Sequence, residues 1–347
     1  MNRKYILTIA IPTYNRNEIL IKNLAALIPQ INHKCELLII DNHSDLPISE
    51  STKEMIKSDH NKNIRIIRNV ANVGGNENIL RCVEHAQGEY VWMLGDDDVP
   101  FSNAVQNVLD EISANPDAVV INMYADATSH QMRDATRLCK GASGYLRSSR
   151  FLGELIFISS LIFSRTRCLR HLATAHLMQS TFAPQLFLAL LSLGNDGYCV
   201  ISNKKTVISG GGTTPLTLQY PSIYVAVGIA GLLDYRWDNE IHNALLRHLI
   251  YVRKVWMTPY GIINQLLQIS QCRSTADSRE IAFRLYRTIG SRLYSLGSII
   301  NFEKILFRMG VLALIFPKLG IAAKKILWQI KRKNMPYTEI SASKERL

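Results

Sequence analysis

The first 125 residues alternate between short, continuous apolar runs and segments in which apolar residues recur at helical spacing. Continuous runs such as Tyr5–Pro12 are typical of strands that are buried on both faces of a sheet. The pattern predicts strands at 5–12, 36–40, 64–67, 89–94 and 118–123, with helices at 16–28, 50–58, 76–86 and 102–114. This alternation predicts an α/β fold with a mostly parallel sheet flanked by helices.

The pattern is less regular after residue 125. Residues 125–150 are polar and predict a loop, followed by a strand at 157–164, a helix at 182–193 and a short strand at 198–202. The Gly- and Thr-rich segment 209–215 has no regular pattern, so we expect it to be mobile. Apolar spacing from 222 to 333 is mainly helical. We therefore expect a first domain at 1–220, a helical region at 221–335 and a tail at 336–347.

Charge is distributed unevenly between the two ends of the chain. Residues 1–240 carry 22 basic and 23 acidic side chains, whereas residues 241–347 carry 18 and 5, which accounts for the net charge of +12. The whole-chain composition, 47% hydrophobic and 20% charged, is that of an ordinary globular protein. The asymmetry predicts a membrane or another polyanion as the partner of the last third only.

Cysteine spacing and apolar stretches exclude two further classes. The six cysteines are widely spaced without a C-x-x-C motif, which argues against a disulfide framework or zinc site and favours a reducing cytoplasm. The longest apolar stretch, at about 309–323, is interrupted by Pro317 and Lys318, so we expect no membrane-spanning helix.

Polar clusters follow four predicted strands, at 13–16, 41–45, 69–76 and 95–98. Ligands bind beyond the carboxyl ends of parallel strands, and the topology brings these ends to one edge of the sheet. Each cluster alone has a simpler interpretation, because Asp, Asn and Ser also cap the helices that follow strands. Four such clusters together predict a binding site at that edge.

The most informative cluster contains Asp96, Asp97 and Asp98. Adjacent carboxylates raise one another's pKa unless a cation is present, and Mg²⁺ or Mn²⁺ accepts one or two carboxylates together with substrate phosphates. The cluster therefore predicts a metal-bound diphosphate, and the alternative is a solvated acidic turn that caps the next helix. The chain contains neither G-x-G-x-x-G after its first strand nor a P-loop motif, which argues against a dinucleotide or P-loop NTPase site.

Four motifs together resemble glycosyltransferase family 2. They are IAIPTYNR at 9–16, LIIDNHSD at 38–45, NVANVGGN at 69–76 and MLGDDD at 93–98. The resemblance implies the GT-A nucleotide-diphospho-sugar transferase fold over roughly residues 5–205. The segment FISSLIFSR at 157–165 is similar to the abequosyltransferase-like enzymes of bacterial O-antigen assembly.

The resemblance also implies roles for individual residues. Those implied to lie against the nucleotide sugar are Pro12, Thr13, Tyr14, Arg16, Asp41, Asn42, Asn72, Gly75, Asn76, Asp96 and Asp97. Within this set, Asp41 is implied to recognise the base and Asp96 to lie near the ribose. Asp97 and Asp98 are the implied ligands of Mg²⁺ or Mn²⁺. Gly95 departs from the family's D-x-D-D pattern, since an Asp usually stands at that position.

A second departure concerns the general base. Inverting members of the family have a carboxylate at the start of the helix after the middle strands, but QSTFAPQ at 179–185 contains none. General-base catalysis needs a proton acceptor within hydrogen-bond reach of the acceptor hydroxyl. The nearby candidates are Glu154, His176 and Asp196, and His171 is a further titratable side chain in this part of the sequence. Each also has a structural interpretation, so the catalytic residue and the stereochemical outcome stay open.

The basic C-terminal region mixes Lys and Arg with apolar residues at helical spacing and includes Trp328. Such helices lie well in an anionic membrane interface, although helices packed on the main domain with a solvated basic face are the alternative. We expect a cytoplasmic glycosyltransferase, peripheral on the inner face of the plasma membrane, with a nucleotide-diphosphate sugar donor and a lipid-linked glycan acceptor. Its product would be O-antigen or another surface polysaccharide, and its sugar could be a dideoxyhexose. The rival classes are an inactive sugar-nucleotide-binding scaffold and a basic nucleic-acid-binding protein, and no nucleic-acid motif accompanies the charge.

Overall fold

The structure is a computed structural model of the chain. It describes residues 5–52, 63–125, 133–149, 151–178, 181, 183–208, 210 and 229–256, together with Ala322 and Gln329. The chain divides into two compact units, the first formed by Met1–Thr213 with Gly231–His248 and the second by Thr214–Ala230 with Leu249–Leu347. Among the residues described here, no helix is both long and apolar enough to cross a membrane.

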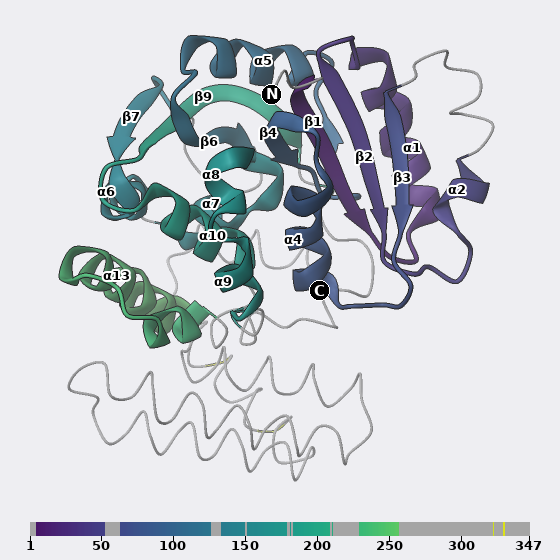
Figure 1. Ribbon diagram of the computed structural model, residues 1–347. Helices are drawn as coiled ribbons and strands as arrows, with labels where there is room; N and C mark the ends of the chain where they lie inside the picture. Colours follow the sequence, from purple (N-terminus) through teal and green to yellow (C-terminus); the bar gives the residue numbers. More distant parts are fainter. Residues whose placement is uncertain are drawn as a thin grey trace. The chain divides into compact units, whose positions relative to one another are not determined.

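The first unit is built on one mixed sheet (Figure 1). Its strands are β1 (Tyr5–Thr13), β2 (Cys35–Asp41), β3 (Ile64–Arg68), β4 (Gly88–Met93), β5 (Val99–Pro100), β6 (Ala118–Ala125), β7 (Arg137–Lys140), β8 (Leu161–Ser164) and β9 (Tyr198–Ile208). The order is β3-β2-β1-β4-β8-β6-β9-β5, and β7 pairs with β9. The parallel arrangement expected for β1 to β4 is confirmed, but β8 runs antiparallel to both β4 and β6.

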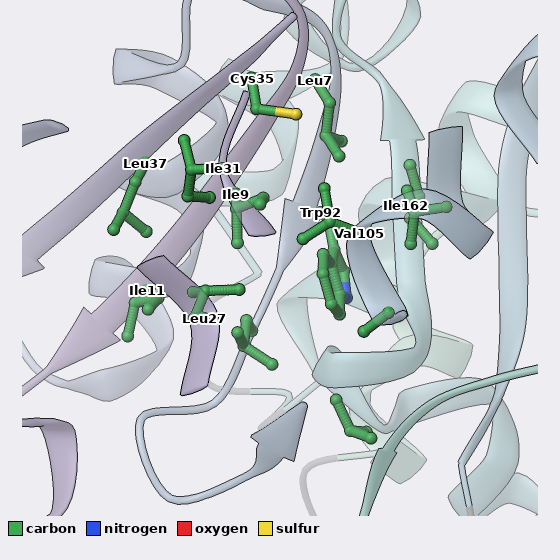
Figure 2. Packing of buried hydrophobic residues seen from close by; sticks show 14 of the residues in the cluster. Leu7, Ile9, Ile11, Leu27, Ile31, Cys35, Leu37, Trp92, Val105 and Ile162 are labelled. Carbon is green, nitrogen blue, oxygen red and sulfur yellow. The ribbon is translucent and has the colours of Figure 1, made fainter. Parts of the chain in front are cut away.

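Helices cover both faces of this sheet. On one face, α1 (Asn17–Leu27) and α5 (Ala104–Ala114) pack against alternate residues of β1, such as Ile9 and Ile11. Figure 2 shows these side chains meeting those of β2, β4 and β8 in a single apolar cluster. The other face is contacted by α4 (Gly75–His85), α8 (Arg165–Leu169) and α10 (Pro184–Leu193) (Figure 1). Burial on both faces explains why β1 and β2 are continuous apolar runs.

Seven short elements and one longer helix, α13, complete the described part. They are η1 (Ile28–Gln30), α2 (Ile48–Ser51), α6 (Gly141–Arg147), α7 (Leu152–Ile156), η2 (Ile158–Ser160), α9 (Leu172–His176), η4 (Gly231–Asp234) and α13 (Asn239–Trp256). In the first unit, Phe187 of α10 packs edge-on against Tyr235 and Trp237, and the Arg147 guanidinium lies 3.3 Å from the Glu240 carboxylate. The segment 231–248 therefore packs on the α10 side of this unit.

The structure corrects three predicted elements. The expected loop at 125–150 contains β7 and α6, and β7 was missed because its edge position leaves most of it exposed. The strand predicted at 157–164 begins only at Leu161, since Ser159 and Ser160 lie in the turn η2. The strand predicted at 198–202 extends to Ile208. Residues 53–58 of the predicted helix 50–58, most of 209–215 and most of 222–333 lie outside the described residues.

Candidate active site

The carboxyl ends of β1 and β4 meet at one edge of the sheet, and Asp96 follows β4 there. Its Oδ2 atom accepts a 2.7 Å hydrogen bond from the Thr13 hydroxyl, and its Oδ1 atom lies 2.7 Å from Arg16 Nη1. Asn23 of α1 donates to the Asp96 carbonyl oxygen at 2.8 Å. Asp96 is 6% exposed, and contacts from the end of β1, the loop after it and α1 fix the acidic turn in place.

Asp98 is bound from the opposite side of the same turn. The Ser159 hydroxyl donates to Asp98 Oδ2, and the Gly210 amide donates to Oδ1 at 3.2 Å. Asp98 is 4% exposed, whereas the Asp97 side chain keeps 29% of its surface exposed and lies 3.2 Å from Arg16 Nη1. Asp97 is thus the most accessible of the three carboxylates.

The acidic turn carries more negative charge than its surroundings neutralise. Burial raises the pKa of Asp96 above its usual range, and the neighbouring Asp97 adds to this against the effects of Arg16 and Thr13. Burial also raises the pKa of Asp98, again opposed by hydrogen bonds from Ser159 and Gly210. Arg16 is the cation that contacts this turn among the described residues, and it faces two of the three carboxylates. A further cation would stabilise the ionised turn.

The donor set fits Mg²⁺ or Mn²⁺. Hard divalent cations take carboxylate oxygens and complete their coordination with substrate phosphates and water. Asp97 and Asp98 can supply two carboxylates, and no group of three or more His, Cys, Asp or Glu side chains suited to a metal occurs in the described part of the chain. Substrate phosphates and water are the usual further ligands of such a cation.

The loops after β1 and β2 are joined side by side. The Asn15 amide nitrogen donates to Ser44 Oγ at 2.9 Å, and the Asn15 side chain exchanges two hydrogen bonds with Asp45. Asn15 and His43 have φ angles of +53° and +66°, in the left-handed region that few residues other than glycine adopt. The hydrogen bonds between the loops account for this backbone conformation at Asn15.

Asp41 lies beneath these loops and is 1% exposed. Its carboxylate accepts hydrogen bonds from the Ser44 and Ile48 amides, at 2.8 and 3.3 Å, and from Arg68 at 2.7 Å. Burial alone would raise the pKa of Asp41, but these hydrogen bonds together lower it below the ordinary value. In this conformation both carboxylate oxygens of Asp41 are already hydrogen-bonded within the protein, and they support the loop after β2.

Buried amides connect β2 with the Gly-rich segment. Asn42 Oδ1 accepts from Asn69 at 2.9 Å and from the Val73 amide at 3.0 Å, while Asn42 Nδ2 donates to Asn72 Oδ1 at 2.8 Å. Asn69 also donates to Asn78 in α4 at 2.9 Å. This network fixes the path of residues 69–74 and therefore the position at which α4 begins.

The start of α4 is open to a ligand. Gly74 caps the helix with a φ of +88°, and the helix has no side-chain cap at this end. A Cβ atom added to Gly74 or Gly75 would meet no atom within 4 Å. The start of a helix favours an anion, and the resemblance implies that Gly75 and Asn76 lie on the phosphate side of the donor.

The implied binding residues fall into two groups by exposure. Tyr14, Asn72 and Gly75 are exposed, and Pro12, Arg16, Asn76 and Asp97 are partly exposed. Thr13, Asp41, Asn42, Asp96 and Asp98 are buried within the hydrogen-bond network. Sequence reasoning missed Asn23, Arg68 and Ser159, which contact these buried residues. In the sequence, these three residues stand out only as polar side chains within apolar or basic stretches. Many residues without a functional role have the same pattern.

The three candidate bases have different surroundings. Asp196 lies between α10 and β9, and β9 runs parallel to β6, so Asp196 is at the edge opposite the acidic turn. Glu154 accepts a 2.6 Å hydrogen bond from the Ser149 hydroxyl. His176 ends α9, and its Nδ1 atom lies 3.0 Å from the carboxylate of Glu77 in the first turn of α4. Because α4 follows β3, that turn lies at the same edge as the acidic turn.

Comparison with known sequences agrees with this geometry. Residues 8–171 match the family model described as Glycosyl transferase family 2. Abequosyltransferase RfbV of Salmonella typhimurium (strain LT2) is 37% identical over 98 residues, a segment that spans 27% of this chain and 28% of that protein. The resemblance to glycosyltransferase family 2 is therefore confirmed for this part of the chain.

Solved structures share the fold. TarS 1–349 from S. aureus is 15% identical with a TM-score of 0.53, and the match covers 89% of this chain and 90% of that chain. The mannosyltransferase PcManGT from Pyrobaculum calidifontis, solved with GDP-Man and Mn²⁺, is 14% identical with a TM-score of 0.51, covering 94% and 85%. The chain has the GT-A fold, as the motifs implied.

Proposed function

We propose that this chain is a glycosyltransferase that moves a sugar from a nucleotide-diphosphate donor to a glycan acceptor. The observation that carries the proposal is the largely buried turn Asp96–Asp98, whose negative charge exceeds that of the cation beside it and which is tied to the end of β1 and the loop after it. The match of residues 8–171 to glycosyltransferase family 2 supports it. In this proposal the exposed Tyr14 and Asn72 contact the nucleotide, and Asp41 and Asn42 support the loops beneath it.

Asp97 and Asp98 would bind Mg²⁺ or Mn²⁺. The metal would supply electrostatic stabilisation of the diphosphate as it leaves the sugar. Arg16 lies within 3.2 Å of Asp97 and would orient that carboxylate while it neutralises Asp96. The open start of α4 would add backbone amides on the phosphate side of the site.

His176 is our candidate for the general base. It lies 3.0 Å from Glu77 through Nδ1, an arrangement in which the carboxylate fixes the imidazole orientation and Nε2 is the second ring nitrogen that can accept a proton. Asp196 lies at the wrong edge of the sheet for this role, and Glu154 is already paired with Ser149. A group in this role must reach the acceptor hydroxyl directly or through one water.

The acceptor we propose is a lipid-linked glycan of O-antigen or another surface polysaccharide. The 37% identical segment of an abequosyltransferase supports this and makes a dideoxyhexose a donor sugar to test first. Residues 221–335, which carry most of the excess positive charge, would place the protein on the inner face of the plasma membrane. Most of that region lies outside the described residues.

The experiment screens UDP, GDP, CDP and dTDP with Mn²⁺ by thermal shift and then assays transfer from the matching nucleotide sugars. At equal ligand concentration, stabilisation of the folded state grows with the logarithm of ligand affinity, so the correct nucleotide should raise Tm most. Asp97→Ala and Asp98→Ala should abolish transfer while the far-UV circular dichroism spectrum is retained. Nucleotide binding by wild-type protein without turnover of any nucleotide sugar would instead establish a sugar-nucleotide-binding scaffold. Full activity of both variants in excess chelator would exclude the metal role.

A further inference from the structure

Ser159 lies in η2, just before β8, and its side chain contacts both ends of the acidic turn at 95–98. Its hydroxyl oxygen accepts a 2.7 Å hydrogen bond from the Gly95 amide, and the hydroxyl proton is donated to Asp98 Oδ2. Ser159 is fully buried. One side chain therefore makes hydrogen bonds with both the first residue of the turn, Gly95, and the last, Asp98. The Asp98 amide also donates a hydrogen bond to the Gly95 carbonyl oxygen at 3.3 Å.

The backbone of Ser159 has a separate structural contact. Trp92, a core residue of β4, donates its indole N–H to the Ser159 carbonyl oxygen at 2.9 Å. Buried indole groups need such a partner, and this one would remain in any variant that changes only the side chain. The contribution of the hydroxyl can therefore be separated experimentally from the anchoring of η2 to β4.

The same contacts explain why position 95 is glycine. A Cβ atom at Gly95 would lie 2.7 Å from Asp98 Oδ2 and 3.2 Å from Ser159 Oγ. A side chain at this position cannot coexist with the observed position of the Asp98 carboxylate. Gly95 and Ser159 thus act together, since the first leaves the space that Asp98 occupies and the second binds the carboxylate there.

We propose that Ser159 is a positioning residue that orients the Asp98 carboxylate for the divalent metal, an inference that rests on the proposed function. Without the hydroxyl, Asp98 Oδ2 loses its donor and the Gly95 amide loses its acceptor inside a buried turn. Of the contacts described for this carboxylate, the Gly210 amide on the other oxygen then remains, so the carboxylate can rotate about its side-chain torsions. Removing the hydrogen-bond partners of metal-ligating side chains typically costs about 10–100-fold in metal affinity.

Ser160 offers a matched control in the same turn. It is 1% exposed, and its hydroxyl donates only to the nearby Phe157 carbonyl at 2.8 Å among the described contacts. Ser159→Ala and Ser160→Ala therefore remove the same atom from adjacent buried positions. Ser159→Thr keeps the hydroxyl and tests rescue, and Gly95→Ala tests displacement of Asp98 with Ser159 intact.

The test measures Mn²⁺ binding by electron paramagnetic resonance of free Mn²⁺, in the full-length protein saturated with the nucleoside diphosphate that stabilises it most. We expect Ser159→Ala and Gly95→Ala to weaken Mn²⁺ binding by about tenfold or more. Ser160→Ala should change it less than twofold, and Ser159→Thr should restore most of the loss. If Ser159→Thr does not fold, the comparison of the two alanine variants decides.

Equal Mn²⁺ affinity in Ser159→Ala, Ser160→Ala and wild-type protein would overturn the positioning role. A loss of thermal stability shared by both alanine variants, with unchanged Mn²⁺ binding, would likewise assign Ser159 to folding alone. Mn²⁺ binding does not require turnover, so the two proposals can fail separately. If wild-type protein binds Mn²⁺, Ser159→Ala weakens that binding and no sugar is transferred, the proposed function is refuted and this inference stands.

Discussion

The hydroxyl of Thr13 donates a 2.7 Å hydrogen bond to Asp96 Oδ2, although 83 residues separate them in sequence. The contact exists because β1 and β4 are parallel neighbours whose carboxyl ends lie at the same edge of the sheet. It joins the first loop to the acidic turn before any ligand is present. The geometry of the proposed donor site is therefore set mainly by buried polar contacts between loops, and the exposed residues are placed by them.

The first prediction concerns Arg16, whose guanidinium neutralises Asp96 and Asp97. Arg16→Met keeps the apolar stem but leaves the mostly buried Asp96 without its cation. Breaking a buried ion pair in this way typically costs about 3–5 kcal/mol, so we expect a clear decrease in the free energy of unfolding in urea. Arg16→Lys, the control, keeps the charge and should lose less. Equal stability of wild type and Arg16→Met would show that the pair carries no net energy.

A second prediction concerns Gly210, whose amide donates to Asp98. A Cβ atom at this position would lie 1.8 Å from the Asp97 carbonyl oxygen, so Gly210→Ala must separate the backbone at position 210 from the acidic turn. We expect Gly210→Ala to need a higher concentration of divalent metal for half-maximal transfer, with little change in Tm. Gly153→Ala in α7 is the matched control, since its Cβ would meet no atom within 4 Å. An unchanged metal requirement in Gly210→Ala would contradict this contact.

The pH dependence of stability tests Asp41. Its folded-state pKa is lowered below the ordinary value of 3.8, so the folded protein binds fewer protons there than the unfolded chain. The resulting stabilisation is complete above the unfolded pKa and is lost as the pH falls through the folded pKa. We expect Asp41→Asn to lower stability at pH 7 and to flatten the decline of stability below about pH 4. Parallel urea denaturation curves of both proteins from pH 3 to pH 7 measure this difference.

The fold and the location of the site could be predicted from the sequence to a useful degree. Strands β1, β2 and β4 are largely apolar runs, whereas β3 also carries two arginines, and the polar residues that follow these strands mark the edge of the candidate site. The details of the site could not be predicted, because they depend on β8 running antiparallel between β4 and β6. That insertion brings Ser159 against Gly95 and Asp98, and no periodicity in the chain signals it. Burial of Asp41 and Asn42 was missed for a similar reason, since it depends on loops that meet only after folding.

The last prediction tests His176 as general base. His176→Gln keeps a hydrogen-bonding side chain but removes the proton acceptor, so kcat should fall by about 10²–10⁴-fold with little change in the donor KM. Glu77→Gln should reduce kcat less, because the amide oxygen can still accept a hydrogen bond from Nδ1. His171→Gln, at the other end of α9, is the control and should retain full activity. Steady-state kinetics of the three variants decide the point. If His176→Gln and Glu77→Gln lower Tm while kcat stays at the wild-type value, the pair only ties α9 to α4, and the base must be sought elsewhere.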